Sequence, residues 1–293
     1  MKIKEVKNKI LEMYQTSLHC KFDDIGKHPI RVVESAKSII GINPEKPIVK
    51  ILDVCDNYLK NFKTKNISFD PQSMKTLEVV TYLELELSLQ KRDTKKSFEN
   101  IFNLSKVSDG KQILEFLIEF SLRHCNFSFL TIWSIYRMQM FMNFDKILDS
   151  LFVCAQLIIG DIGVSRERYK GSIEEYYSEY IIEQNTFDLF YNLYRIYNED
   201  FTRKVKIRSY ILSIIKEKCK ILKNNEQNYI YKKDQENKGR HWILEYLDSA
   251  DMDSINIEGI LILDAARGTL KIIGNDSKST KVWSDLNKAY EFK

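Results

Sequence analysis

The sequence contains no proline after Pro71, although the chain runs to residue 293. Proline interrupts helices more strongly than any other residue, because it lacks the backbone N–H and its ring clashes with the preceding turn. Its absence from most of the chain therefore permits one helix after another. Apolar residues there recur at helical spacing, as at Ile113, Leu114 and Leu117, whereas strict alternation is scarce.

These patterns predict an all-α protein, built as a multi-helix bundle or an irregular stack of helical hairpins with roughly twelve to fourteen helices. A hydrophobic content of 44% is enough for a sizeable core. A glycine-bounded stretch between Gly160 and Gly171 breaks the helical rhythm. We therefore expect a single all-α domain in two lobes, an N-terminal helical lobe over 1–160 and a C-terminal helical lobe over 172–293.

The five cysteines are an odd number, are widely spaced and include no Cys-x-x-Cys pair. The opening MKIKEVKNKI has no apolar run typical of a signal peptide. Reduced thiols in a cytoplasmic protein are the expected state. The most apolar stretch, from His124 to Phe144, carries Arg137 and Gln139, so it predicts a buried helix or helix pair and no membrane insertion.

The usual catalytic and cofactor motifs are missing. No Gly-x-Gly-x-x-Gly, no Gly-Lys-Ser/Thr loop and no Gly-x-Ser-x-Gly elbow occurs, so we expect no cofactor and no enzyme activity. The four histidines have no zinc-ligand spacing, so no metal is expected. Arg123-His124 and Arg240-His241 are the only close pairs suited to phosphodiester chemistry, and an RNase with a site assembled from distant helices stays an alternative.

Charge is segregated along the C-terminal half, although the net charge is only +4. The chain is acidic from Glu174 to Asp200, where Arg195 is the only basic residue. It is basic from Arg203 to Arg240 and acidic again from Glu245 to Asp264. Pairing between neighbouring helices explains such blocks, and nucleic-acid binding through Arg203 to Arg240 is a less favoured alternative.

The first acidic block opens with a capping box, Ser172 to Glu175, which predicts a helix from Ile173 to about Gln184. On that helix, Ile173, Tyr177 and Ile181 share the face expected to pack on the core. Tyrosines flanked by carboxylates on the wetter side suit a basic protein partner better than nucleic acid. The predicted partner-binding residues are Glu175, Tyr176, Glu179, Tyr180 and Glu183.

The next helix carries a wide aromatic stripe that includes Phe187, Tyr191 and Tyr194. Such a stripe is more often core than ligand site. We therefore expect it to be buried. If the predicted partner-binding residues between Glu175 and Glu183 do not form the interface, the acidic segment from Glu245 to Asp264 is the next candidate.

The segment NIEGILILDAARGTLKIIGNDSK, from Asn256 to Lys278, has a glycine after an acidic residue, an Ala-Ala centre and an aliphatic-Gly ending. It resembles the last helix of all-α immunity proteins from bacterial polymorphic toxin systems. The resemblance implies a non-enzymatic inhibitor that binds a cognate toxin domain with a basic surface, and it implies no catalytic residues.

The leading hypothesis is therefore a cytoplasmic protein-binding protein, specifically an immunity protein that neutralises a toxin by direct binding. A helical regulatory or scaffold protein that binds peptides in a concave groove is the first alternative. An RNA-binding protein or RNase of a phage-defence module is the second.

Overall fold

The computed structural model describes residues 2–21, 25–64, 76, 79–219, 221–223, 231–274 and 278–290. These residues confirm the all-α class: they form fifteen α-helices, of which α9 and α12 have only 7 and 6 residues. The helices are α1 (Ile3–Leu18), α2 (Pro29–Ile40), α3 (Lys50–Leu59), α4 (Tyr82–Gln90), α5 (Thr94–Val107), α6 (Gly110–His124), α7 (Ser128–Phe141), α8 (Ile147–Asp161), α9 (Ile173–Glu179), α10 (Phe187–Asn198), α11 (Lys204–Lys218), α12 (Lys233–Lys238), α13 (Arg240–Ser249), α14 (Ile257–Ile273) and α15 (Ser279–Ala289).

Two short strands interrupt the helices, β1 (Tyr180–Ile182) and β2 (Ile221–Lys223), which pair antiparallel. The prediction of a helix reaching Gln184 is therefore wrong, because α9 ends at Glu179. β1 contains two isoleucines and β2 contains one, and β-branched residues favour extended backbone. Pairing with β2 satisfies the backbone groups that a longer helix would have bonded internally.

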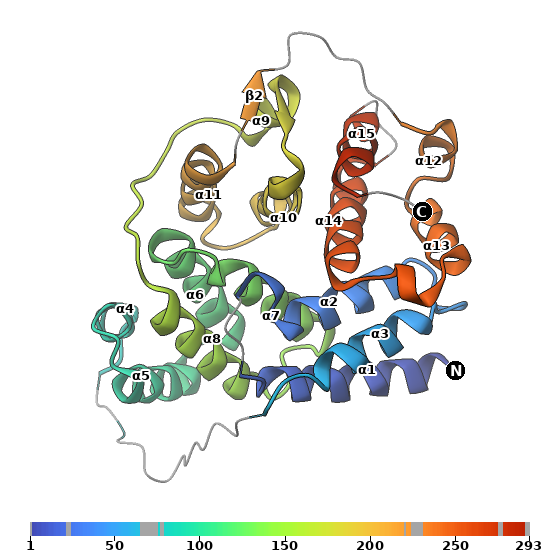
Figure 1. Cartoon of the computed structure of the whole chain (residues 1–293). Coiled ribbons are helices and arrows are strands. Elements are labelled where there is room, and N and C mark those ends of the chain that lie inside the picture. Colours follow the sequence, from blue (N-terminus) through green and yellow to red (C-terminus); the bar gives the residue numbers. More distant parts are fainter. Residues whose placement is uncertain are drawn as a thin grey trace.

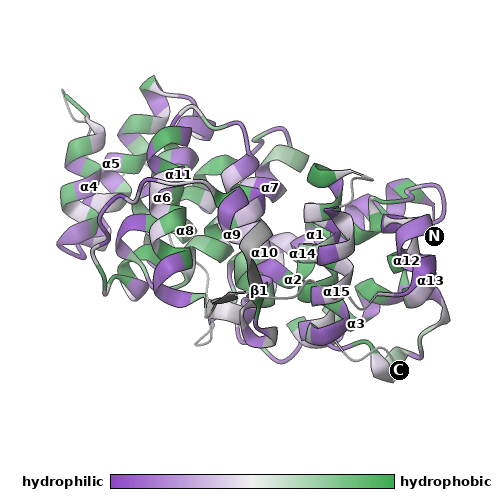
Figure 2. Cartoon of the chain, turned by 90° about the horizontal axis from the view of Figure 1, so that it is seen from above, coloured by the Kyte–Doolittle hydropathy of each residue, from purple (hydrophilic) through white to green (hydrophobic). Residues whose placement is uncertain are grey.

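The helices form an elongated molecule, with α4 and α5 at one end and α12 and α13 at the other (Figures 1 and 2). In Figure 1 the helices of the first half run along the lower part and those of the second half along the upper part. Helix α14 packs against α2 and α10, and α11 packs against α6. The two predicted lobes are therefore joined by extensive helix packing.

Side-chain caps start several helices where the sequence offers a suitable residue. Asp93 accepts from the Lys96 N–H at 2.9 Å to begin α5, and Asn256 accepts from the Gly259 N–H at 2.7 Å to begin α14. Ser172 accepts from the Glu174 N–H at 3.2 Å before α9, one residue earlier than the Glu175 N–H that the capping-box pattern predicted.

The apolar stretch from His124 to Phe144 contributes α7, which is buried over most of its length. Tyr136 and Phe129 are among the largest fully buried side chains. The prediction of a buried helix is confirmed. Among the described residues, no helix combines the length and the apolar character needed to cross a bilayer.

The predicted loop after Gly160 begins slightly later than expected, because α8 continues to Asp161. The Asp161 carboxylate accepts from the N–H groups of Phe127 and Ser128 at 2.8 and 2.7 Å and so caps α7. Arg166, in the loop, donates to the Leu122 carbonyl at 2.9 Å. The connection between the predicted lobes is thus held against α6 and α7.

Candidate protein-binding groove

The first acidic block, from Glu174 to Asp200, is called the acidic tyrosine segment below. It does not present the single helical face expected from the sequence. Glu175 is exposed, but Tyr176 is half-buried and packs on the core. Glu183 lies beyond β1, off the helix, and is half-buried. The side chains of Glu179 and Tyr180 lie outside the described part of the structure. The five predicted residues therefore do not share one helix, and their role in binding stays a prediction.

The inner side of this segment is anchored to its neighbours. Ile173 and Tyr177 are buried, which confirms two of the three predicted core residues, and the Ile181 side chain lies outside the described part. Glu174 forms an ion pair with Lys278 at 2.9 Å and accepts a hydrogen bond from the Tyr194 hydroxyl at 2.8 Å. The segment is therefore fastened to α10 and to the start of α15.

The aromatic stripe of α10 is core, as predicted. Phe187, Tyr191 and Tyr194 are all buried. The Tyr191 hydroxyl donates to Asp285 Oδ2 at 2.7 Å, so its polar end is satisfied inside the protein.

Cations of the basic segment are largely engaged within the protein. Arg203 pairs with Glu119 at 2.7 Å, and its guanidinium lies 5.2 Å from the centre of the Phe116 ring. Arg208 Nε donates to the Tyr197 carbonyl at 2.8 Å. Residues 220 and 224–230 and the Lys223 side chain lie outside the described part. Arg203 and Arg208 thus serve packing more directly than they offer a surface for phosphates.

A buried ionic cluster occupies the centre of the molecule, where α2, α7, α10 and α14 meet. Asp264 pairs with Arg195 at 2.9 Å, with Arg267 at 2.7 Å and with Arg137 at 3.3 Å. Arg137 also pairs with Glu34 at 2.9 Å. These five residues are called the central ionic cluster below.

Sequence analysis missed this cluster because its members come from four separate helices. Two signals pointed to it: Asp264 and Arg267 are three residues apart on one helix, and Arg195 is the only cation in an acidic block. Gly268 belongs to the same arrangement, because a Cβ at that position would collide with the Arg195 guanidinium. The glycine lets α10 and α14 approach closely.

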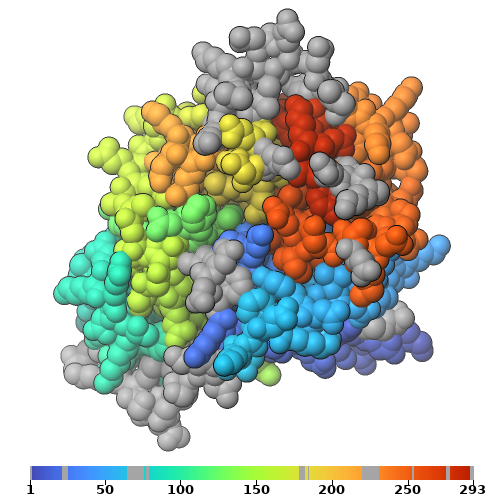
Figure 3. Space-filling model, in the orientation of Figure 1, coloured from blue at the N-terminus to red at the C-terminus, as the bar shows by residue number. Residues whose placement is uncertain are grey.

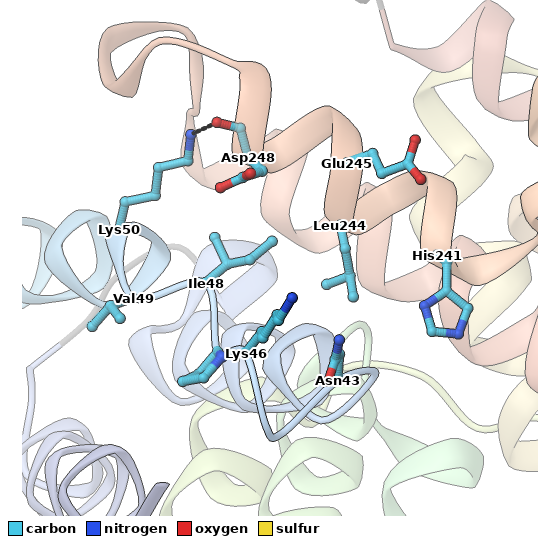
Figure 4. Close-up of a pocket in the computed structure, with 10 residues that line it drawn as sticks. Asn43, Lys46, Ile48, Val49, Lys50, His241, Leu244, Glu245 and Asp248 are labelled. Atoms are coloured by element: carbon cyan, nitrogen blue, oxygen red, sulfur yellow. Dashed lines mark hydrogen bonds between the residues drawn. The ribbon is translucent and has the colours of Figure 1, made fainter. Parts of the chain in front are cut away.

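A groove with a volume of about 640 Å³ lies between α13 and the connection from α2 to α3 (Figure 4). In the space-filling view, the orange C-terminal helices border the light-blue surface of this early segment (Figure 3). We call it the α13 groove; it is lined by Asn43, Lys46, Pro47, Ile48, Val49, Lys50, His241, Leu244, Glu245 and Asp248.

The floor of the α13 groove is apolar. Leu244 points from α13 toward the segment that carries Asn43 and Lys46 (Figure 4). Ile48 is 9% exposed and forms part of the same floor. The opposite face of α13, with Trp242 and Leu247, is buried in the core. Amphipathic burial therefore fixes which side chains of α13 reach the groove.

The rims of the α13 groove carry polar groups that the described residues leave available. His241 and Asp248 on α13, and Lys46 across the groove, are exposed, and none has a side-chain hydrogen bond or ion pair with another described residue. Lys50 joins the two walls, since its ammonium donates to the Asp248 and Ala250 carbonyls at 2.7 and 2.8 Å. The groove thus offers donors and acceptors from both sides.

The α13 groove overlaps the second acidic segment, from Glu245 to Asp264, that the sequence proposed as the alternative interface. Glu245 and Asp248 line it, whereas Asp264 lies in the central ionic cluster. Glu245 is partly engaged by Lys238 at 2.6 Å.

No family model matches the chain, and no curated protein or solved structure is significantly similar to it. Among the described residues, no three His, Cys, Asp or Glu side chains are grouped so as to hold a metal ion. The five cysteines are free thiols, and four of them are buried.

Proposed function

We propose that this chain is a protein-binding protein that holds a segment of its partner in the α13 groove. One observation carries the proposal: an apolar floor lies between rims whose His241, Asp248 and Lys46 side chains are exposed and not paired with other described residues. Protein interfaces combine such an apolar centre with a polar rim. Rim charges of both signs fix the register and orientation of a bound segment.

A segment of a protein fits this groove better than a compact polar metabolite. The groove is about 640 Å³ in volume and its two walls come from segments nearly two hundred residues apart in the chain. Leu244 and Ile48 offer burial for an apolar anchor side chain, and anchors of this kind carry most of the binding energy at interfaces. The rim groups then pair with polar groups on either side of the anchor.

The narrower form of the proposal is an immunity protein that neutralises a toxin, which rests on the resemblance of the segment from Asn256 to Lys278. Helix α14, which contains most of that segment, is buried at the centre and packs against α13. In this proposal α14 positions the groove from behind and does not itself contact the toxin.

The test uses the product of the neighbouring gene as the candidate partner. Co-expression should rescue growth if that product is toxic, and the two purified proteins should form a stoichiometric complex. Reversing two rim charges, with Lys46→Glu and Asp248→Lys, should weaken the complex at least about tenfold, because both changes place like charges against the partner.

Lys95→Glu is the matched control, since Lys95 is an exposed lysine on α5, far from α13 (Figure 2). Binding should be unchanged in this variant. A complex that tolerates both rim reversals would overturn the α13 groove as the interface. A neighbouring product that neither binds nor harms the cell would remove the immunity proposal.

A further inference from the structure

A second groove lies on the other side of the connection between α2 and α3, between α1 and the end of α2, and has a volume of about 410 Å³. Its lining is almost entirely apolar, in contrast to that of the α13 groove. We call it the α1 groove; it is lined by Ile3, Lys4, Val6, Lys7, Ile10, Lys37, Ile40, Gly41, Pro44 and Phe141.

Two of the three lysines that line the α1 groove approach the same aromatic ring. The ammonium groups of Lys7, on α1, and Lys37, on α2, lie 5.6 and 5.4 Å from the centre of the Phe141 ring. Both ammonium groups therefore lie beside the same aromatic ring, next to the apolar walls, and Lys4 is the third lysine in the lining. Ile3, also in the lining, is 52% exposed, so the groove is open to solvent.

Lys37 also connects this groove to the central ionic cluster, since its ammonium lies 3.2 Å from Glu34. Within ion-pair distance, the carboxylates of Glu34 and Asp264 face four cations: Lys37, Arg137, Arg195 and Arg267. Buried charges are stable when opposite charges balance them. Lys37, at the groove end of this chain of ion pairs, is therefore well placed to accept a further anion.

We propose that the α1 groove binds a long-chain carboxylate, with the alkyl chain on Ile3, Ile10 and Ile40 and the carboxylate between Lys7 and Lys37. Small-molecule sites typically have volumes of roughly 300–1,000 Å³ and combine apolar walls with a few placed polar groups, which describes this groove. Removal of the alkyl chain from water drives the binding, and the two lysines orient the ligand.

The wall chemistry favours this ligand over an extended peptide. A peptide backbone brings an N–H and a C=O at each residue, and the apolar lining offers almost nothing to pair with them. A single anionic head on an apolar chain, in contrast, matches two lysines that lie beside one aromatic ring. Soluble fatty acids and the anionic lipids of a membrane surface both carry this chemistry, and the proposal commits to the soluble carboxylate.

Titration calorimetry on the full chain with sodium laurate, below its critical micelle concentration, tests the proposal. One molecule should bind per chain, and dodecyltrimethylammonium, which has the same alkyl length and the opposite charge, should bind at least about tenfold more weakly. Lys7→Glu should weaken laurate binding by about tenfold, whereas Lys7→Arg should retain it. Lys7 is exposed, so these variants should fold normally.

Lys95→Glu changes the net charge by the same amount on a distant helix, and laurate affinity should stay within about twofold of the original. Equal effects of Lys7→Glu and Lys95→Glu would overturn the proposal, as would equal binding of the anionic and cationic chains. Binding to phosphatidylglycerol vesicles without binding of laurate would also overturn it and would make the face of α1 a membrane-surface site. Competition by an acidic amphipathic peptide alone would assign the groove to a protein.

Discussion

The central ionic cluster and the α13 groove contain the same kinds of side chain in opposite circumstances. In the cluster, Asp264 has a relative exposure of 2% and is surrounded by three arginines. At the groove, Asp248 also lies on a helix, but it is exposed and its carboxylate has no described partner. One aspartate is committed to holding helices together, whereas the other is available to a ligand.

This difference shows that charge in the sequence does not by itself mark a binding surface. The basic segment after Arg203 is the richest in cations, yet Arg203 and Arg208 are engaged by neighbouring helices. The α13 groove has fewer charges, but three of its exposed rim side chains, His241, Asp248 and Lys46, are not paired with other described residues. The basic segment and the α13 groove therefore differ in how many charged side chains are free to contact a ligand, rather than in how many charges they contain.

The largest effect is expected from Asp264→Ala. It would leave Arg195 and Arg267 buried without their carboxylate, and breaking a buried ion pair in this way costs about 3–5 kcal/mol in the free energy of unfolding. Denaturant unfolding measures the loss. Asp248→Ala is the matched control and should change stability by less than about 0.5 kcal/mol. Similar losses in both variants would remove the distinction between committed and available carboxylates.

Tyr177→Ala tests whether the acidic tyrosine segment is likewise held in place by its buried side chains. Tyr177 is buried, and its hydroxyl donates to the Lys278 carbonyl, so removal of the side chain should cost about 3 kcal/mol through the cavity left behind. Tyr177→Phe keeps the ring and should cost only about 1 kcal/mol for the lost hydrogen bond. Thermal melts separate the two. A loss below about 1 kcal/mol for the alanine variant would mean that this segment is not anchored as described.

A pH-dependent loss of stability is expected from His28, whose Nδ1 accepts from the Ile30 N–H at 3.2 Å and caps α2. Burial, together with nearby Arg31, lowers the pKa of His28 to about 3. The unfolded chain binds the proton near pH 6.5, so this stability is present above that pH and is lost as the pH falls toward 3.

At pH 5 the loss should be about 2 kcal/mol relative to neutral pH. His28→Asn keeps an acceptor for the cap and removes the titrating group. The decrease in the free energy of unfolding from pH 7 to pH 5 should therefore be about 2 kcal/mol smaller in this variant than in the original protein. Identical pH profiles for the two proteins would show that His28 is accessible to protons in the folded state.

The smallest effect concerns the basic segment. Arg203→Gln should destabilise the protein by about 1 kcal/mol, because Arg203 pairs with Glu119 and stacks on the Phe116 ring, while Lys206 still lies 3.5 Å from Glu119. Lys204→Gln, at the adjacent position and more exposed, should change stability by less than about 0.5 kcal/mol. If Lys204→Gln were the more costly change, the basic segment would not be structured by the contacts of Arg203.

Local patterns predicted much of the helical architecture. The apolar spacing of α6 and the aromatic stripe of α10 each identified a buried face, because helical periodicity places those residues on one side regardless of the rest of the fold. The end of α9 could not be predicted in the same way. Its termination depends on β1 pairing with β2, about forty residues later in the chain.

The candidate site was predictable only on one side. Glu245 and Asp248 were noted as part of an acidic segment, but Lys46 and Ile48 face them only because α2, α3 and α13 are all held around α14. The central ionic cluster depends in the same way on four helices. Contacts between distant segments leave no pattern in the local sequence. The residues of one wall of the groove therefore could not predict which residues form the opposite wall.

The connection between α2 and α3 contributes to both grooves. Gly41 and Pro44 line the α1 groove, and Pro47 and Ile48, a few residues later, line the α13 groove. This short segment is therefore a wall shared by the two grooves. If each groove binds its proposed ligand, a ligand that displaces the wall from one side will change the affinity on the other, and by thermodynamic linkage each ligand will alter the affinity for its counterpart by the same factor.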